Sequence, residues 1–293
     1  MNEEFVKEKK KAAKLSIVSN SFLIVLKFVA GFISGSIGII SEAIHSGTDL
    51  LASFIAYFSI SKSSQPADKE HPYGHDKYED FAGFVEGLLI IFAAFYIIHE
   101  AVKKILNPEL IELDVDLGLL IMGISIIANF FVSGYLFKVA QKTTSMALHA
   151  DGEHLRTDVY SSLAVFLGLL FVKVTDNPVF DPVVAICVAV IIFFAGYRIC
   201  RDCTSNLLDT SLSENENSYI RGIIGDFINE SEVIEIKNMR TRKAGMKKNI
   251  DITLSVNGIM PISQAHELCD RIEKQIEDSI QNTDITIHVE PHK

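Results

Sequence analysis

Apolar residues dominate six stretches of the chain, and polar connections separate these stretches. The stretches lie at about 15–35, 38–60, 80–103, 116–138, 150–173 and 179–200. Each is close to the roughly 20 apolar residues that an α-helix needs to cross a lipid bilayer. The pattern therefore predicts six transmembrane helices over residues 15–207, preceded by a polar N-terminal segment of residues 1–14.

The pattern changes in residues 208–293, where apolar positions recur with the periods of a soluble domain. Residues 214–230 and 262–279 are predicted helices. Residues 233–242, 249–256 and 284–289 are predicted strands, and the second alternates apolar with polar side chains. The order predicts a small α+β domain of αββαβ, metallochaperone-like form.

Basic residues gather at one end of the predicted transmembrane helices. On this side are the lysines of the N-terminal segment, Lys62, Lys69, Lys77, Lys138, Lys142, Arg198 and Arg201. Cytoplasmic connections carry an excess of lysine and arginine, so both termini are expected in the cytoplasm. No cleavable signal peptide is expected, because no small-residue cleavage site precedes the first apolar stretch.

Composition fits such a mixed chain, since 48% of the 293 residues are hydrophobic and 22% are charged. The formal net charge of -10 argues against a nucleic-acid partner and suits a protein that handles cations. The cysteines indicate no disulfide framework, because Cys187 lies within an apolar stretch. Cys200 and Cys203 form a lone CxxC pair, which is only a weak signal for metal or redox chemistry.

Two His–Asp pairs interrupt the apolar stretches. His45 and Asp49 are four residues apart in the second stretch, and His154 and Asp158 repeat this spacing in the fifth. On a helix the members of each pair share a face. Ionisable side chains at membrane depth are costly and point to function. Two imidazoles and two carboxylates suit a tetrahedral site for Zn²⁺ or a similar ion; pairs that only hydrogen-bond to each other are the alternative.

Lys27 is an isolated basic residue within the first apolar stretch. Its ammonium group either pairs with an acid such as Glu42 or extends to the membrane surface. A structural role is therefore expected for Lys27, and a functional role is the alternative.

The connection between the second and third stretches contains another candidate metal site. Asp68, His71 and His75 lie close together in sequence, and Pro72 and Gly74 bend the chain between them. One carboxylate and two imidazoles can bind zinc, but a fourth ligand is missing. A solvated polar loop is the alternative on spacing alone.

In the C-terminal domain the candidate ligands are His266, His288, Glu290 and His292. His288 and Glu290 are two residues apart on a predicted strand, so their side chains share a face. His266 lies on the second predicted helix of the domain. Isolated surface histidines without a ligand are the alternative.

Sequence motifs of enzymes and pumps are absent. His99 with Glu100, and His149 with Glu153 and His154, lack the spacing of the HExxH and HxxEH zinc-protease motifs. The chain also has no GxSxG, no phosphate-binding P-loop and no phosphorylatable aspartate motif of a pump. An ATP-driven transporter or an intramembrane hydrolase therefore has little support.

Together these features resemble the cation diffusion facilitator family. The resemblance rests on six apolar stretches, HxxxD in the second and fifth, the loop motif PADxxHPYGHxKxE, and the αββαβ domain. It extends over nearly the whole chain. Members are divalent-metal/proton antiporters, so the resemblance implies a secondary active transporter, not an enzyme, without an organic cofactor. It implies efflux of Zn²⁺ from the cytoplasm across the inner membrane.

The resemblance also implies roles for individual residues. Those that match the family's transport site are His45, Asp49, His154 and Asp158, and those that match its loop site are Asp68, His71 and His75. His45 makes the transport site similar to the two-His, two-Asp site of zinc-selective members. In the cytoplasmic binuclear site only His266, His288 and Glu290 match, because Lys237 and Thr253 stand where histidines are expected.

The family is dimeric, so a homodimer is implied, with a charge cluster where the membrane and soluble parts meet. Lys77, Asp209 and Arg242 match that cluster. Zn²⁺ is then the substrate and also an allosteric ligand of the soluble domain, while protons and the lipid bilayer are the other partners.

Two alternatives stay open. Two imidazoles with two carboxylates also suit Fe²⁺, Co²⁺, Mn²⁺ and Cd²⁺, so the metal is not fixed by ligand type. A membrane metal sensor that does not translocate its ion is the other alternative. It would have little use for two ligand pairs buried in different spans, and a flux measurement separates it from a transporter.

Overall fold

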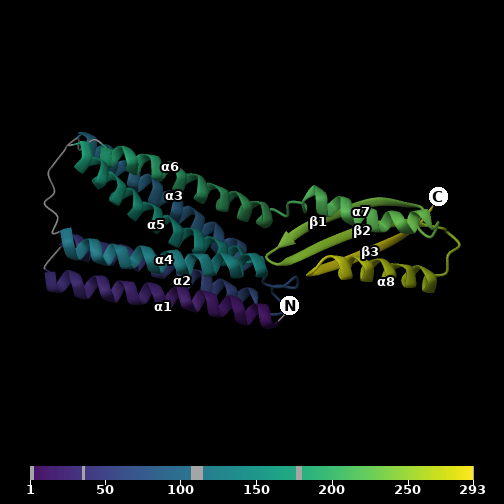
Figure 1. Cartoon of the computed structure of the whole chain (residues 1–293). Helices are drawn as coiled ribbons and strands as arrows, with labels where there is room; N and C mark the ends of the chain where they lie inside the picture. The colour runs from purple at the N-terminus through teal and green to yellow at the C-terminus, as the bar shows by residue number, and fades with distance from the viewer. Residues whose placement is uncertain (1–2, 35–36, 107–114, 176–179, 293) are drawn as a thin grey trace. The chain divides into compact units, whose positions relative to one another are not determined.

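In the computed structural model (Figure 1), the described residues are 3–34, 37–106, 115–175 and 180–292. Within these ranges some side chains lie outside the description, including those of residues 37–45 and 164–175. The chain divides into two compact units, Met1–Thr204 and Ser205–Lys293, each with its own apolar core.

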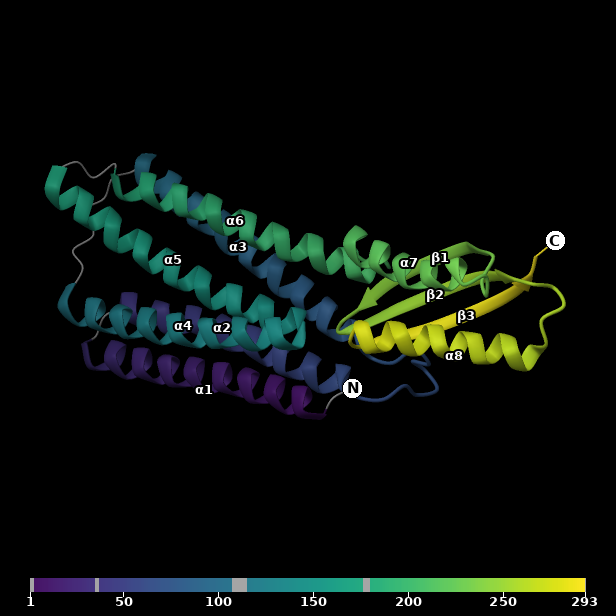
Figure 2. The same ribbon diagram turned by 45° about the vertical axis from the view of Figure 1, so that its right-hand side comes forward.

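The first unit is built from six long helices, as predicted. They are α1 (Glu3–Ser34), α2 (Ile37–Ser63), α3 (Lys77–Leu106), α4 (Val115–Thr143), α5 (Met146–Thr175) and α6 (Phe180–Leu207). Figures 1 and 2 show the helices lying side by side. Among the described residues, four stretches are long and apolar enough to cross a membrane: Glu4–Ala30, Lys77–Lys103, Gly123–Thr143 and Pro182–Leu207.

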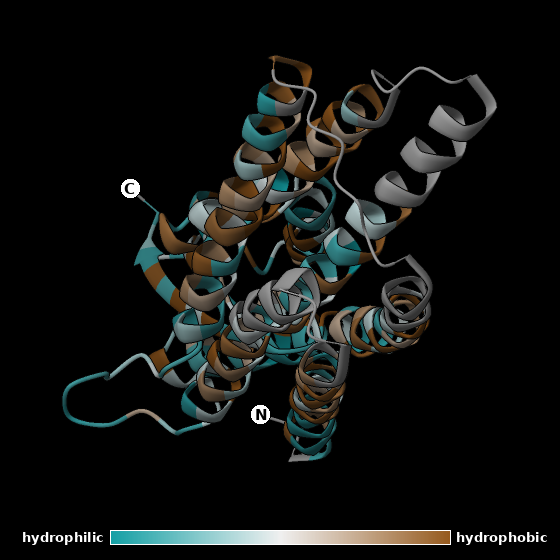
Figure 3. Cartoon of the chain, turned by 90° about the vertical axis from the view of Figure 1, so that its left-hand side faces the viewer, coloured by the Kyte–Doolittle hydropathy of each residue, from teal (hydrophilic) through white to brown (hydrophobic). Residues whose placement is uncertain are grey.

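The helices of this unit turn large apolar side chains outward and keep small polar ones inside. Phe22, Phe92 and Phe131 are more than 60% exposed, whereas Asn20 and Ser53 are buried. Apolar residues, brown in Figure 3, accordingly cover much of the described helices. This distribution is the reverse of a soluble domain and suits a lipid environment, which provides no hydrogen bonds.

Helix α5 lies among α2, α3 and α4, and α2 also packs against α1 and α3. Polar residues of α2 and α5 can therefore meet, as the two His–Asp pairs require. The polar segment predicted for residues 1–14 is part of α1, since the helix begins at Glu3 and buries Ala12 and Ala13.

Small residues allow α3 and α6 to approach closely. A Cβ atom added at Gly83 would lie 2.8 Å from the Sγ of Cys203, and one added at Gly87 would lie 2.7 Å from the Sγ of Cys200. Close packing of small residues is typical of membrane helices. The CxxC pair therefore contributes to the packing between these two helices.

The second unit has the predicted αββαβ order. Its elements are α7 (Glu214–Asn229), β1 (Glu235–Ala244), β2 (Lys247–Val256), α8 (Ile262–Ser279) and β3 (Thr283–Pro291). The sheet has the order β1-β2-β3, with β1 antiparallel and β3 parallel to β2. Alternate residues of β2, Ile250 and Ile252 among them, pack with Ile220 of α7 and Ile272 of α8 in one core.

Candidate metal centres

Three of the four predicted membrane ligands come together between α2 and α5. One ligand atom from each of Asp49, His154 and Asp158 lies within 4.8 Å of the other two. The Nε2 atom of His154 is 3.2 Å from the Oδ1 atom of Asp49, although the residues are 105 positions apart in sequence. Asp49 and His154 are buried, and Asp158 is half-buried.

The helices position these side chains. His154 and Asp158 are one turn apart on α5, so they share a face, as the spacing predicted. On α2, the carbonyl oxygen of Asp49 lies 3.4 Å from the amide nitrogen of Asn20 and 3.3 Å from the hydroxyl of Ser53. A hydrogen bond from Asn20 of α1 thus helps to hold the segment of α2 that carries the ligand.

The fourth predicted ligand, His45, belongs to α2, but its side chain lies outside the described residues. It precedes Asp49 by one helical turn, so its place in the group stays a prediction. Glu42 lies outside the described side chains as well. Lys27 is buried, and its ammonium group donates a hydrogen bond to Ser46 at 2.6 Å.

The donor set of the three membrane residues suits a divalent transition-metal ion. Two carboxylates with one imidazole carry net negative charge when the ring is neutral, and burial makes that charge costly without a cation. Imidazole and carboxylate are ligands of Zn²⁺ and of its first-row neighbours. In a transport site this ion is the substrate.

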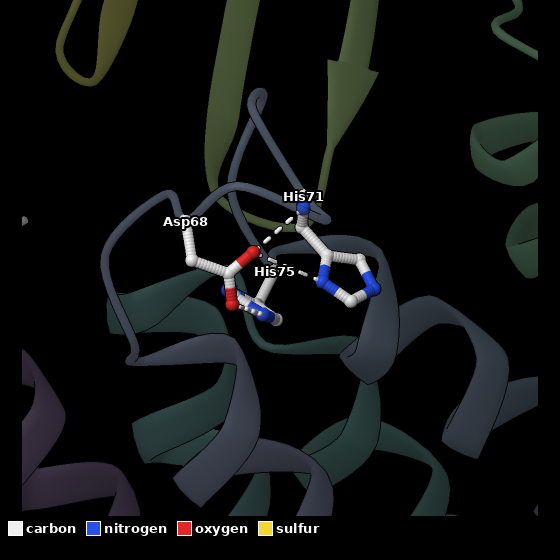
Figure 4. A group of neighbouring side chains, drawn as sticks. All are labelled: Asp68, His71 and His75. Carbon is white, nitrogen blue, oxygen red and sulfur yellow. Dashed lines mark hydrogen bonds and ion pairs between the residues drawn. The ribbon is translucent and has the colours of Figure 1, made fainter.

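The predicted loop ligands also lie together. Figure 4 shows the Asp68 carboxylate facing both His71 and His75. Its Oδ1 atom is 3.3 Å from the Nδ1 of His71, and its Oδ2 atom is 3.4 Å from the Nε2 of His75. Gly74, with φ at 93°, takes the left-handed conformation that turns the chain between the two histidines.

Backbone hydrogen bonds stabilise the ionised carboxylate of Asp68. The N–H groups of His71 and Glu70 donate to Oδ1 of Asp68 at 2.6 and 2.9 Å. The bond from His71 is the main cause of a lowered pKa of the Asp68 carboxyl, and it outweighs desolvation, which acts the other way. Asp68 is therefore ionised and ready to bind a cation at neutral pH. The three ligand atoms lie within 4.8 Å of one another, so they fit a metal ion.

The candidate ligands of the second unit do not form a comparable group. His266 pairs with Asp270 on its own helix at 3.6 Å, and His288 lies 3.7 Å from Glu290. The other carboxylate oxygen of Glu290 binds the ammonium group of Lys237 at 2.6 Å. Among the described residues of this unit, no three ligand atoms come within 4.8 Å of one another.

The predicted charge cluster is divided between the two units. Asp209 and Arg242 form an ion pair of 3.3 Å within the second unit. Lys77 is the first residue of α3 and belongs to the first unit. Its membership in the cluster stays a prediction.

A buried ion pair was not predicted from the sequence. The Nζ of Lys9 and the Oε1 of Glu79 are 2.5 Å apart, and both side chains are 2% exposed. Ser63 donates to the same carboxylate at 2.8 Å, and Ser145 also donates to it. The four residues tie the beginnings of α1 and α3 to the end of α2 and to the connection before α5.

Two further acids, Glu86 of α3 and Asp151 of α5, are fully buried. Both lie within predicted apolar stretches, so the criterion that singled out Asp49 applies to them too. Neither has a histidine four residues away, so the spacing that indicates a metal-ligand pair does not mark these two acids.

Family models match nearly the whole chain. Residues 13–208 match the cation efflux transmembrane domain, and residues 212–292 match the cytoplasmic domain of cation efflux proteins. The chain belongs to the cation diffusion facilitator family. This membership confirms the predicted class, a membrane transporter of the cation-efflux type with a C-terminal domain.

The chain is also similar to individual known proteins. An uncharacterized transporter of Synechocystis is 32% identical over 95% of this chain and 89% of its own. The cation-efflux pump FieF of Yersinia enterocolitica is 27% identical over 99% of this chain and 95% of its own. A solved structure of CzrB, a proposed zinc transporter, is 32% identical and covers 28% of this chain and 99% of its own, with a TM-score of 0.27.

Proposed function

We propose that this member of the family exports divalent transition-metal ions, Zn²⁺ above all, from the cytoplasm in exchange for protons. The observation that carries the proposal is the group formed by Asp49, His154 and Asp158 inside the helical unit. With His45 added, the site offers the four nitrogen and oxygen ligands that suit tetrahedral Zn²⁺.

The same ligands account for coupling to protons. Imidazole binds metal only when it is neutral, and a carboxylate only when it is ionised, so protons and metal compete for the site. When the site opens to a more acidic exterior, protons displace the ion. The protonated site then returns and releases its protons inside, which is alternating access around a fixed site.

We also propose that the transporter is a homodimer in the inner membrane with both termini in the cytoplasm. The excess of basic residues on one side of the helices supports this orientation. A match to the cytoplasmic-domain model, whose short name refers to dimerisation, supports the dimer. The loop group of Asp68, His71 and His75 would bind a second ion, with a regulatory role.

The test is zinc flux in proteoliposomes that contain the purified chain and a metal-sensitive dye. With an acidic interior and neutral exterior, we expect Zn²⁺ to accumulate, and a proton ionophore to abolish the accumulation. Fe²⁺, Mn²⁺, Co²⁺ and Cd²⁺, tested under the same gradient, rank the substrates. Zinc flux that does not depend on the pH gradient would contradict antiport. Zinc binding without any flux would favour a metal sensor.

A further inference from the structure

Glu86 is a buried carboxylate in the interior of the helical unit. Its exposure is 0%, and among the described residues neither Oε1 nor Oε2 has a hydrogen-bond partner. It lies on α3, where Ile90, one turn further along, is part of an apolar core with Ala150 and Ile199. An ionised carboxylate in such surroundings is strongly disfavoured.

The charged group that faces Glu86 from α5 is another acid, Asp151, which is also 0% exposed. From α6 the titratable neighbour is the thiol of Cys203. No ion pair joins Glu86 to a basic side chain among the described residues. Two buried carboxylates that face each other cannot both stay ionised unless a cation lies between or beside them.

The hydrogen bonds of the two acids differ. The Oδ1 of Asp151 accepts from the hydroxyl of Ser53 at 3.1 Å, whereas its Oδ2 has no described partner. A donated hydrogen bond stabilises the ionised form of Asp151, and Glu86 receives none from the described residues. In the part of the chain that the structure describes, neither acid belongs to a group of three close metal ligands. The cation best suited to this pair is therefore a proton carried by Glu86.

The pair lies beside the metal ligands. Asp151 is one helical turn before His154 on α5. The hydroxyl of Ser53 is within hydrogen-bond distance both of Asp151 and of the carbonyl oxygen of Asp49. In the proposed orientation, α5 begins on the cytoplasmic side. Asp151 precedes His154 on this helix, so the pair lies between the metal ligands and the cytoplasm.

We propose that Glu86 and Asp151 form a proton-binding carboxyl pair, with Glu86 as the protonated member, on the cytoplasmic side of the transport site. The inference rests on the proposed proton-coupled export and adds a proton site separate from the metal ligands. When metal enters from the cytoplasm, its positive charge favours release of the Glu86 proton to the cytoplasm. Glu86 thereby carries one of the exchanged protons.

Infrared difference spectroscopy of the full chain in lipid tests the pair without any transport. During a pH titration we expect the carbonyl band of a protonated carboxylic acid at neutral pH, and its loss in Glu86→Gln. Glu100→Gln is the matched control, because Glu100 lies on the same helix with a 40% exposed side chain. The band should persist in that control. An unchanged band in Glu86→Gln would overturn the proposal.

A second variant keeps the test decisive if Glu86→Gln does not fold. Asp151→Asn removes the facing negative charge and should ease ionisation of Glu86, so the band should disappear at a pH lower by about one unit or more. If the pH at which the band disappears were the same in Asp151→Asn and in the wild type, the two acids would not interact and the proposed pair would be wrong. Because these readouts need no metal flux, they are independent of the antiport proposal.

The link to transport is measured as the number of protons released per Zn²⁺ bound, from calorimetry in buffers with different ionisation enthalpies. Glu86→Gln should release fewer protons than the wild type, and Glu100→Gln should release the same number. If the infrared band belongs to Glu86 but proton release is unchanged, the pair binds a proton that takes no part in the exchange, and the proposed role in coupling is wrong.

Discussion

Asp49 of α2 and His154 of α5 meet at 3.2 Å across 105 residues of sequence. Their contact, together with Asp158, places one imidazole and two carboxylates in a single buried group. Apolar residues of the two helices, Ile60 of α2 and Leu155 of α5 among them, pack in one core. Metal transport of the proposed kind depends on this contact between α2 and α5.

The buried pair of Lys9 and Glu79 should contribute strongly to the stability of the helical unit. Lys9→Met leaves the Glu79 carboxylate buried without its cation, and removing one partner of such a pair costs about 3–5 kcal/mol. The expected result is a marked fall in the free energy of unfolding, measured in detergent with a chemical denaturant.

Lys142→Met is the matched control for that experiment. Lys142 pairs with Glu8 at 2.7 Å, but its side chain is 50% exposed, so its loss should change stability little. The double variant Lys9→Met with Glu79→Leu should recover much of the lost stability, because no unpaired charge is then buried. Equal losses in Lys9→Met and Lys142→Met would contradict the structural role.

The loop group should bind one zinc ion per chain. Asp68→Asn removes the carboxylate that contacts both His71 and His75, so equilibrium dialysis should find one ion fewer than in the wild type. Glu70→Gln, in the same loop, keeps the backbone N–H that binds Asp68 and should bind as many ions as the wild type. An unchanged count in Asp68→Asn would exclude this loop as a metal site.

The start of α7 should depend on pH through Glu216. This residue and Ser213 form a capping box, and Lys248 binds Glu216 at 2.8 Å. Partial burial alone would raise the pKa of Glu216, but the hydrogen bonds from Lys248 and Ser213 outweigh it and lower the pKa. Because the folded-state pKa is lowered, the stabilisation is complete above the ordinary carboxyl range and is lost as pH falls through the folded-state value.

Hydrogen–deuterium exchange of α7 in the full chain measures this effect. The wild type should open more readily as pH drops below the ordinary glutamate value, after correction for the intrinsic exchange rate, whereas Glu216→Gln should show a flatter pH profile. Ser213→Ala should lower the opening free energy of α7 by about 1 kcal/mol at neutral pH. A pH profile of Glu216→Gln that matches the wild type would remove Glu216 as the cause.

Much of this arrangement could be predicted because it is encoded by local periodicity. The four-residue spacing of His154 and Asp158 places them on one helix face whatever their neighbours are. Apolar stretches of suitable length predict the helices, and the alternation in β2 predicts its buried face. Asp68, His71 and His75 could be grouped because a short loop cannot separate them widely.

Long-range partners could not be predicted in this way. Lys9 and Glu79 are 70 residues apart, and nothing in their local sequence indicates that α1 and α3 begin next to each other. Likewise, His288 and Glu290 share a strand face, but only the sheet shows that Lys237 of β1 reaches Glu290 of β3. Periodicity identifies the face of an element, whereas the partner depends on tertiary packing.

The claim that Asp49 and Asp158 bind the transported ion is tested most directly by zinc flux into proteoliposomes that contain Asp49→Asn or Asp158→Asn. The interior of these proteoliposomes is acidic and the exterior is neutral. Both substitutions keep the side-chain shape and remove a ligand charge, and Asp202→Asn, at an exposed acid of α6 paired with Arg201, is the control. We predict that zinc flux in Asp49→Asn and Asp158→Asn falls to the level of protein-free liposomes, while Asp202→Asn transports zinc like the wild type. Wild-type flux in either ligand variant would contradict it.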